Sequence, residues 1–495
     1  MGVEMSGSGE LLRQADERLK RGDAPGGAKI LSEFLKRYPN DPRAPKLRAT
    51  LGEVQLSLGR LDEAQELLER AIKERGESVH LLFRLAQTYG FQGRTDDALA
   101  LIDRILELDP DHDGAIARRA ALFQYLGRID EAAEVIDAAY ARGLQSYHLA
   151  HAFAGIASRT SRRAEAIARL SPYVSDASIP GKVRAEMLFT LGRLYDGEGE
   201  FDAAWSSYEQ ANALLKPRID ISEIDRATDD VIERFTREAI ESFERAEASA
   251  ERVILVVGMP RSGTTLLENI LGAHRQIAPG GELTALPKAV DSIPGTRPPS
   301  FMPAVKRVRG NALRRANRMY LEAIDGVSAE AARVVDKLPA NYRYLGLLPA
   351  LLPGVHVIHC RRHPLDTCVS CFFRNFAGQH LIYTDLEWIA RSYRNYVRLM
   401  QHWESVLEGL LEIHEAVYEH VVGDLEGSAR RLVGAVGLEF DEACLRFNEQ
   451  RRMAATLEPE QAGQRVYDTS IGRWKNYEKH LGPLIDALGP ELAGL

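Results

Sequence analysis

A spacing of 34 residues recurs in the first half of the chain, where it separates Gly59, Gly93 and Gly127. A repeating unit of this length accommodates one helix, a tight turn and a second helix. Glycine permits close helix contact or positive φ near such a turn. A single unit cannot bury its apolar face, so the spacing predicts a stacked helical array. Other positions keep the same interval: Arg60, Arg94 and Arg128, then Asp62, Asp96 and Asp130, Ala64, Ala98 and Ala132, and the apolar Leu68, Ile102 and Ile136.

This repeat resembles the tetratricopeptide family, which has the same period. Weaker copies precede and follow the three clear ones, which predicts an array of about five or six units over residues 1–218. Such arrays present an extended surface, so we expect a protein or peptide partner there, with a rigid spacer as the alternative. Residues 219–250 have apolar side chains at helical spacing, which predicts a helical connector.

Composition excludes several classes of protein. The 495 residues include 63 Lys and Arg and 71 Asp and Glu, which gives a formal net charge of −8. This balance gives no reason to expect a nucleic acid or membrane partner. Apolar stretches fall far short of the ~20 residues that cross a bilayer, and no leader pattern is present. Four cysteines do not form a disulfide scaffold. We therefore expect a soluble, cytoplasmic protein.

The second half opens with an apolar run over residues 253–258, a loop, and a helical pattern from Thr264. Backbone N–H groups at such a junction can hold an anionic oxygen cluster. Gly258 and Gly263 have the spacing of a nucleotide-binding P-loop, but Thr264 and Thr265 stand where that motif needs Lys and then Ser or Thr. The guanidinium of Arg261 suits bidentate capture of an oxyanion. A kinase or NTPase remains the alternative, to be tested with ATP and magnesium.

The sequence PRSGTT at 260–265 resembles the 5′-phosphosulfate loop of sulfotransferases that use 3′-phosphoadenylyl sulfate (PAPS). The similarity is greatest to the tyrosylprotein sulfotransferases and to bacterial sulfotransferases fused to tetratricopeptide arrays. It implies a doubly wound parallel α/β domain over residues 251–495, with a ligand crevice beyond the carboxyl ends of the strands. It also implies that PAPS is the donor and that no metal is needed. The implied donor-loop contacts are Arg261, Ser262, Gly263, Thr264 and Thr265.

Two further blocks supply candidate catalytic residues. Glu282 follows a Gly-Gly pair, and the resemblance implies that it is the general base for an acceptor hydroxyl, whose pKa lies near or above 10. Lys337 follows a second predicted strand, over residues 333–336, and the resemblance implies contact with the transferring sulfonate. Together with Arg261, Lys337 would stabilise charge on the sulfonate and the leaving phosphate.

A third predicted strand, residues 355–360, precedes the block that resembles the family's 3′-phosphate site. The residues implied there are Arg362, Ser370 and Arg374, the last two on one face of a helix over 365–376. Tyr418 at a strand end and Arg473 in a C-terminal loop complete the implied donor site. Cys368 and Cys371, with nearby histidines, also fit a metal or redox site, but strand residues alternate faces, so we expect buried apolar cysteines instead.

One departure from the family concerns Glu458, which stands where relatives usually have a serine near the sulfonate. A carboxylate there would repel the donor, unless the loop register differs or the side chain points away. The expected activity is sulfonate transfer from PAPS to an acceptor hydroxyl, with a protein or peptide tyrosine as the first choice. A carbohydrate or small-molecule acceptor and a catalytically inactive scaffold are the alternatives.

Overall fold

The computed structural model of the chain describes residues 2–295, 301–376, 381–449 and 470–494. Contacts divide the chain into two units. Unit 1 comprises Met1–Ile179 and Arg193–Gly199, and unit 2 comprises Pro180–Gly192 and Glu200–Leu495.

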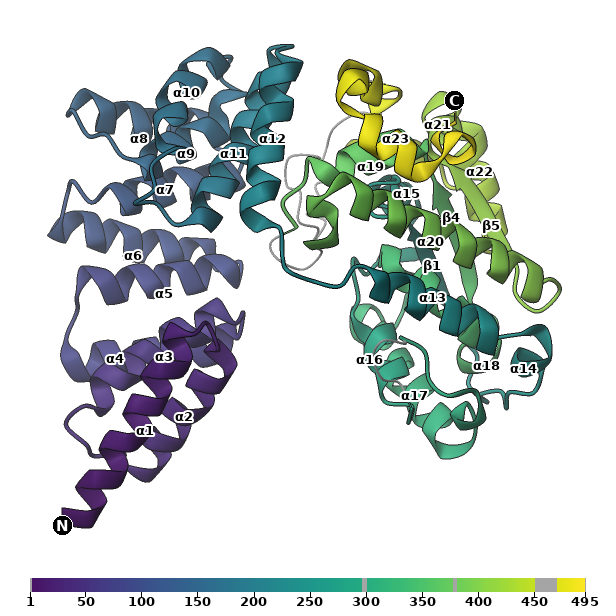
Figure 1. Cartoon of the computed structure of the whole chain (residues 1–495), viewed down its shortest axis with the longest axis horizontal. Helices are drawn as coiled ribbons and strands as arrows, with labels where there is room; N and C mark the ends of the chain where they lie inside the picture. Colours follow the sequence, from purple (N-terminus) through teal and green to yellow (C-terminus); the bar gives the residue numbers. More distant parts are fainter. Residues whose placement is uncertain (1, 296–300, 377–380, 450–469, 495) are drawn as a thin grey trace. The chain divides into compact units, whose positions relative to one another are not determined.

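Helices in consecutive pairs form the first part of the chain, as the repeat predicts (Figure 1). Their bounds are α1 Gly2–Lys20, α2 Ala24–Arg37, α3 Ala44–Ser57, α4 Leu61–Arg75, α5 Val79–Phe91, α6 Thr95–Leu108, α7 Asp113–Tyr125, α8 Ile129–Ala141, α9 Tyr147–Ala157, α10 Arg163–Leu170, α11 Gly181–Gly197 and α12 Phe201–Leu215, with a short 3₁₀ turn η1 at Ser171–Tyr173.

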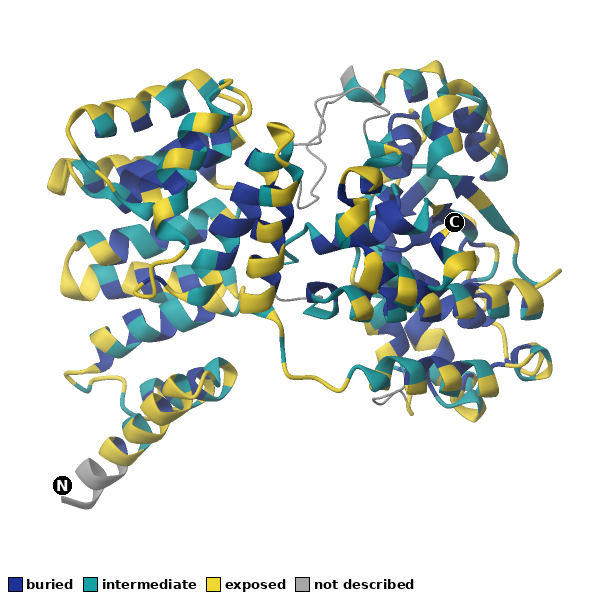
Figure 2. Ribbon diagram, turned by 45° about the horizontal axis from the view of Figure 1, so that its top comes forward, coloured by how far each residue is buried: buried dark blue, intermediate teal, exposed yellow. Residues whose placement is uncertain are grey.

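The repeated positions have the structural roles that their residue types predict. The three repeated alanines and the three repeated apolar residues at 68, 102 and 136 are fully buried. Gly59, Gly93 and Gly127 have φ of 72°, 76° and 76°, a conformation that glycine adopts without strain. The next position in the series is Ser161, which has φ of 56° despite its side chain. Small and apolar residues at a fixed period therefore build the core of the array (Figure 2).

Two of the repeated arginines, Arg94 and Arg128, connect the two helices of their units. The Arg94 guanidinium lies 4.0 Å from the ring centroid of Tyr89 on α5, and its Nε donates to Asp97 on α6 at 2.8 Å. Arg128 repeats this arrangement with Phe123 and Glu131, and so does Arg162 with Phe153 and Glu165. Cation–π contact and charge pairing together explain why arginine recurs at this position.

The α/β part of unit 2 has a five-stranded parallel sheet of order β2-β3-β1-β4-β5. This agrees with the expected fold class. The strands are β1 Val253–Gly258, β2 Ile277–Pro279, β3 Arg333–Asp336, β4 His356–Arg361 and β5 Ile413–Val417. The helices are α13 Ser222–Arg234, α14 Arg237–Glu241, α15 Thr264–Gly272, α16 Ala285–Asp291, α17 Gly310–Val327, α18 Leu348–Leu351, α19 Pro364–Phe372, α20 Leu386–Val406, α21 Tyr418–Gly423, α22 Leu425–Ala435, α23 Gly482–Leu488 and α24 Pro490–Ala493. The 3₁₀ segments are η2 Val305–Arg307, η3 Pro339–Leu347, η4 Leu381–Thr384, η5 Glu442–Glu449 and η7 Arg473–His480.

Helices cover both faces of this sheet. Apolar residues of α15 and α22 pack on β1, β3 and β4 from one side. On the other side, Tyr320 of α17 bonds the Asp336 side chain of β3, and Tyr396 of α20 contacts His359 of β4. The strand β2 is only three residues long, and the sequence pattern did not reveal it. Because all five strands run parallel, their carboxyl ends lie at the same edge of the sheet.

Helix α12 is the last helix of the array in sequence, but its contacts assign it to unit 2. Trp205 and Tyr208 of α12 are buried, and their rings lie 5.2 Å and 4.0 Å from those of Phe372 and Phe373. Asn212 donates to the Phe372 carbonyl at 2.8 Å. In the described residues, no helix combines the length and the apolar character that a bilayer crossing requires.

Candidate active site

The candidate residues follow the ends of the five strands at one edge of the sheet. Parallel strands that lie side by side bring these positions together, although up to 157 residues separate them, from Arg261 to Tyr418. Lys337, Arg362 and Tyr418 come directly after β3, β4 and β5, and Glu282 and Arg261 come three residues after the ends of β2 and β1.

The loop between β1 and α15 has an unusual backbone. Arg261 has φ of 71°, one of two non-glycine residues with positive φ in the described chain. Such strain in a non-glycine residue is typical of functional sites. Gly258 lies so close to β4 that a Cβ there would be 2.4 Å from the Cys360 carbonyl oxygen. The start of the loop therefore packs against the backbone of β4. Ser262 is buried, and its hydroxyl donates to the Met259 carbonyl at 2.8 Å.

The N-terminus of α15 has no side-chain cap. Its N-cap, Gly263, has φ of 105°, and a Cβ there would lie 2.4 Å from the ring of Tyr418. Thr264 and Thr265 are the first two residues of the helix. First-turn N–H groups without a side-chain acceptor form a site for an anion, and the helix dipole adds to the attraction.

The Lys337 ammonium lies between two carboxylates. Its Nζ donates to Glu282 Oε1 at 2.8 Å and lies 3.7 Å from Glu268 Oε2. Only 1% of the Lys337 side chain is exposed, against 44% for Glu282. The predicted base therefore faces solvent while its cationic partner lies buried beneath it. This arrangement can accept a proton at the exposed carboxylate and stabilise negative charge from below.

Glu268 of α15 is a site residue that the sequence analysis missed. Its Oε1 accepts the Gly281 N–H at 2.7 Å, so it fixes the turn that presents Glu282. Its Oε2 has no hydrogen-bond partner among the described residues. Burial raises the pKa of Glu268, and the charge of Lys337 opposes this rise. A signal was available, because Glu268 is a carboxylate inside an otherwise apolar helical run, four residues after Thr264.

Arg362 connects the donor loop to the predicted 3′-phosphate block. Its Nη1 donates to the Arg261 carbonyl at 3.1 Å, and its guanidinium lies 5.0 Å from the Tyr418 ring centroid. Arg261 Nε donates to Ser370 Oγ on α19 at 2.9 Å. The structure thus brings Arg261, Arg362, Ser370 and Tyr418 together. The Nε of Arg362 is buried and bonds to no described residue, which leaves a donor for an anionic ligand.

Arg374 is not on the helix that the sequence predicts. Helix α19 ends at Phe372, so the expectation of one shared helical face with Ser370 was wrong. Apolar packing explains the early end, because Phe372 and Phe373 turn into the aromatic cluster around Trp205. Glu458, the expected departure from the family, lies outside the described residues.

Asp366 holds the C-terminal loop, and the sequence analysis missed this residue too. Its carboxylate accepts the N–H groups of Gly472 at 2.7 Å and Trp474 at 3.0 Å. These two residues flank Arg473, which is thereby anchored to the first turn of α19. The Arg362 guanidinium lies 3.9 Å from the same carboxylate. The spacing of four residues between Arg362 and Asp366 was the available signal.

A second buried polar group lies directly before Lys337. Tyr320 Oη and Asn341 Nδ2 donate to Asp336 Oδ2 at 2.9 Å and 3.2 Å. Burial raises the pKa of Asp336 to about 7. The cysteines also behave as buried apolar groups, since burial raises the pKa of Cys360 and of Cys371 to about 12. Among the described residues, no three His, Cys, Asp or Glu side chains are grouped as metal ligands would be.

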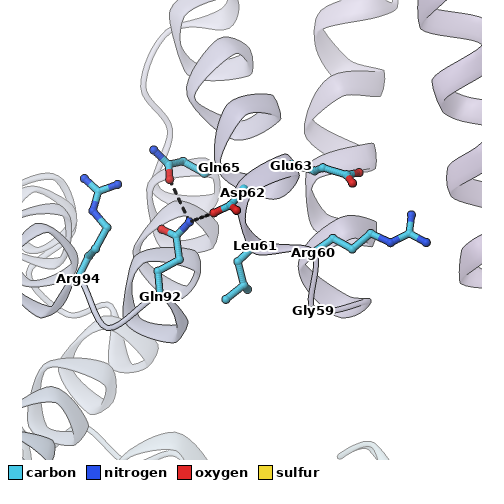
Figure 3. Close-up of a pocket in the computed structure, with 8 residues that line it drawn as sticks. All are labelled: Gly59, Arg60, Leu61, Asp62, Glu63, Gln65, Gln92 and Arg94. Atoms are coloured by element: carbon cyan, nitrogen blue, oxygen red, sulfur yellow. Dashed lines mark hydrogen bonds between the residues drawn. The ribbon is translucent and has the colours of Figure 1, made fainter. Parts of the chain in front are cut away.

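Unit 1 has a polar surface hollow at the ends of its helices (Figure 3). Gln92 Nε2 donates to Asp62 and to Gln65 at 3.0 Å each. Two arginines and two carboxylates line the hollow, so its formal charge is zero. Arg94 is also paired with Asp97. The hollow is formed entirely within the repeats and has no base–lysine pair of the kind found at the sheet edge. Its lining residues are Gly59, Arg60, Leu61, Asp62, Glu63, Gln65, Gln92 and Arg94.

Comparison with known families assigns both parts of the chain. Residues 253–442 match the sulfotransferase family, and residues 12–76, 55–122 and 185–214 match tetratricopeptide repeats. An uncharacterized protein of Aquifex aeolicus (strain VF5) is 32% identical over 335 residues, which are 66% of this chain and 44% of that protein. The chain thus spans less than half the length of this relative.

Solved structures of tetratricopeptide proteins are also similar to part of the chain. A repeat protein from Parabacteroides merdae has a TM-score of 0.31 at 20% identity, covering 42% of this chain and 91% of its own. PilW, a type IV pilus biogenesis factor, has a TM-score of 0.34 at 18% identity, covering 42% and 92%. The family matches show that the chain contains tetratricopeptide repeats and a sulfotransferase-family domain.

Proposed function

We propose that unit 2 transfers a sulfonate group from PAPS to a tyrosine hydroxyl of a protein or peptide that the helical array holds. The observation that supports this most strongly is the Glu282–Lys337 pair, 2.8 Å apart, beside an uncapped helix N-terminus and a strained arginine loop. A base, a buried cation and an anion cradle at one sheet edge are the groups that sulfonate transfer requires.

The residues at this edge fit PAPS. Backbone N–H groups of Gly263, Thr264 and Thr265 would hold the 5′-phosphosulfate, together with Arg261 and Ser262. Arg362, whose Nε lacks a partner among the described residues, would hold the 3′-phosphate with Ser370. Arg374, Tyr418 and Arg473 are proposed to complete the donor site. PAPS supplies the sulfonate and leaves as adenosine 3′,5′-bisphosphate.

In the proposed reaction the exposed carboxylate of Glu282 takes the proton from the acceptor hydroxyl. The hydroxyl oxygen then forms a bond to sulfur while the bond from sulfur to the bridging phosphate oxygen breaks, and its electron pair goes to the phosphate. Arg261 and Lys337 stabilise the charge that develops there. These fixed cations make a metal unnecessary in this proposal.

The first test is the thermal shift of the full chain with adenosine 3′,5′-bisphosphate, compared with AMP, ADP and ATP with magnesium. A ligand that binds only the folded state raises the unfolding midpoint. We expect a rise that is selective for the bisphosphate. A rise with ATP and magnesium alone would reject the proposal in favour of a kinase or NTPase, and no rise with any nucleotide would favour an inactive scaffold.

Two variants test the assigned roles. Glu282→Gln should lower transfer from PAPS by about 10²–10⁴-fold with nucleotide binding retained, because only proton removal is lost. Arg362→Ala should remove the preference for the 3′-phosphorylated nucleotide over ADP. Arg361→Ala is the matched control, since Arg361 is the adjacent residue, exposed and paired with Glu415. Transfer of sulfonate from PAPS to tyrosine peptides and to glycans, measured in parallel, identifies the acceptor class.

A further inference from the structure

The donor loop between β1 and α15 is held through its backbone carbonyls. The Met259 carbonyl accepts from the Ser262 N–H at 3.2 Å and from the Ser262 hydroxyl at 2.8 Å. The Arg261 carbonyl accepts from Arg362 Nη1 at 3.1 Å. These bonds leave the carbonyls of Pro260 and Ser262, for which the fold must supply other donors.

Two buried thiols supply these donors. Cys371 Sγ of α19 donates to the Pro260 carbonyl at 3.4 Å, and Cys360 Sγ of β4 donates to the Ser262 carbonyl at 3.1 Å. Both side chains are buried, and burial raises the pKa of each thiol to about 12. Each thiol therefore keeps, near neutral pH, the proton that it donates. One carbonyl on each side of Arg261 is thus tied to a different element of the fold.

The thiol bonds also fix the direction of the N–H groups that follow. In a trans peptide the C=O and the N–H of one plane are antiparallel. The plane that joins Pro260 to Arg261 presents its carbonyl to α19, so its N–H is directed away from that helix. The plane that joins Ser262 to Gly263 presents its carbonyl to β4, so the Gly263 N–H is directed away from that strand. Loop N–H groups fixed in this way form a concavity that binds anions.

Arg261 needs such support because its backbone is strained. Its φ of 71° is unfavourable for a residue with a Cβ. Strain of this kind persists only where the surrounding structure holds it in place. Without the two thiol bonds, the peptide planes on both sides of Arg261 would rotate to relieve the strain, and their N–H groups would change direction.

Cys368 provides a comparison within the same helix. It lies three residues before Cys371 on α19 and is also buried. Of the four cysteines, which all lie in the described part of the chain, only Cys360 and Cys371 donate to the donor loop. Burial alone therefore does not account for the two contacts.

We propose that Cys360 and Cys371 are positioning residues of the donor loop. Their S–H groups hold the peptide planes on both sides of Arg261 in the conformation that binds the 5′-phosphosulfate of PAPS. The ligand in this proposal rests on the proposed function, whereas the hold on the loop is a property of the unliganded protein. The two parts are therefore tested separately.

Hydrogen–deuterium exchange of the full chain without nucleotide tests the hold on the loop. We expect Cys360→Ala and Cys371→Ala each to speed exchange in peptides that cover residues 259–263 by about threefold or more, because each loses one weak hydrogen bond. Cys360→Ser and Cys371→Ser should exchange as wild type does, since a hydroxyl can donate to the same carbonyl. Cys368→Ala is the matched control for lost volume and should leave exchange of the loop unchanged.

Isothermal titration calorimetry with two nucleotides tests the ligand. Adenosine 3′,5′-bisphosphate has a 5′-phosphate for the donor loop, and adenosine 3′-phosphate has none. We expect each alanine variant to bind the bisphosphate about threefold more weakly than wild type, and the double variant about tenfold, with binding of adenosine 3′-phosphate changed by less than about twofold. The serine variants and Cys368→Ala should bind both nucleotides as wild type does.

Three results would each overturn the proposal: loop exchange that is as fast in Cys368→Ala as in the other alanine variants, serine variants that behave like the alanine variants, or an equal loss of affinity for both nucleotides. If wild type binds neither nucleotide while the exchange results are as expected, the proposed donor site is rejected and the role of the thiols in holding the loop is supported.

Discussion

At the scale of single residues, the site depends on how one ammonium is shared. Lys337 contacts Glu282 at 2.8 Å and Glu268 at 3.7 Å, so two carboxylates face one buried cation. Glu268 also fixes the turn before Glu282 through the Gly281 N–H. Glu268 is therefore a positioning residue for both groups, whereas Glu282 and Lys337 are the proposed catalytic residues.

Glu268→Gln keeps an oxygen for the Gly281 N–H and removes the negative charge. Glu282 then faces an ammonium that no second carboxylate offsets, so we expect the acidic limb of the pH–rate profile for transfer from PAPS to move to lower pH, with kcat reduced about tenfold. Glu268→Ala, which also loses the bond to Gly281, should lower the unfolding midpoint as well. A profile that superimposes on wild type would contradict this role.

Asp336 makes the stability of unit 2 depend on pH. Its pKa of about 7 exceeds the ordinary value of about 3.9. Between about pH 4 and pH 7 the unfolded chain loses this proton while the folded chain keeps it. The contribution of Asp336 to the free energy of unfolding therefore falls as pH rises through this window and is constant above it.

We accordingly expect Asp336→Asn to gain stability relative to wild type as the pH rises from about 4 to about 7. The full gain is on the order of 4 kcal/mol, from about three pH units at about 1.4 kcal/mol each. Urea unfolding of both proteins at several pH values measures it. A difference between the two proteins that stays constant with pH would show that Asp336 is ionised in the fold.

At the scale of elements, the turn glycines show how the repeat specifies its backbone. Gly59, Gly93 and Gly127 take positive φ without strain, whereas Ser161 takes φ of 56° at the same position of the next repeat. A left-handed conformation disfavours a residue with a Cβ by about 1–2 kcal/mol. The unit formed by α9 and α10 therefore keeps the turn although its sequence has lost the preferred residue.

Ser161→Gly should stabilise unit 1 by about 1 kcal/mol, since it removes this strain. Gly127→Ser is the matched control in the preceding repeat and should destabilise by a similar amount. Chemical denaturation followed by circular dichroism measures both changes. Equal stability of Ser161→Gly and wild type would mean that the serine hydroxyl compensates for the strain.

At the scale of the whole molecule, the end of the array and the start of the α/β fold share a helix. Repeat sequence extends to residue 214, yet α12 packs its aromatic residues within unit 2. Trp205 is 5% exposed and Tyr208 1%. The boundaries 1–218, 219–250 and 251–495 that the sequence predicts stay a proposal, and cutting the chain tests them.

A fragment of residues 180–495 should unfold at least about 5 °C above a fragment of residues 219–495. The shorter fragment exposes the rings of Phe372, Phe373 and Tyr477 that α12 covers, and loss of one buried tryptophan alone costs about 3–5 kcal/mol. Differential scanning calorimetry measures the difference. Equal midpoints would place the boundary after α12, as the sequence predicts.

Local patterns in the sequence determined much of this protein. A period of 34 residues gave the helical array, because burial of one face and a glycine turn both act within a single unit. The run at 253–258 and its glycine loop gave β1 and the start of α15 for the same reason. Predicted strand ends marked Lys337 and Arg362, since parallel strands bring their carboxyl ends to one edge, whereas Glu282 was found through the Gly-Gly pair and the family resemblance.

The tertiary structure alone decided how buried polar groups are paired. Glu268 meets Lys337 and Gly281, and Asp366 meets Gly472, only because distant segments cross at the sheet edge. The early end of α19 at Phe372 likewise follows from packing against α12. A sequence states the preference of each segment, but a buried charge must be satisfied by whichever group the fold places beside it, and no local pattern names that group.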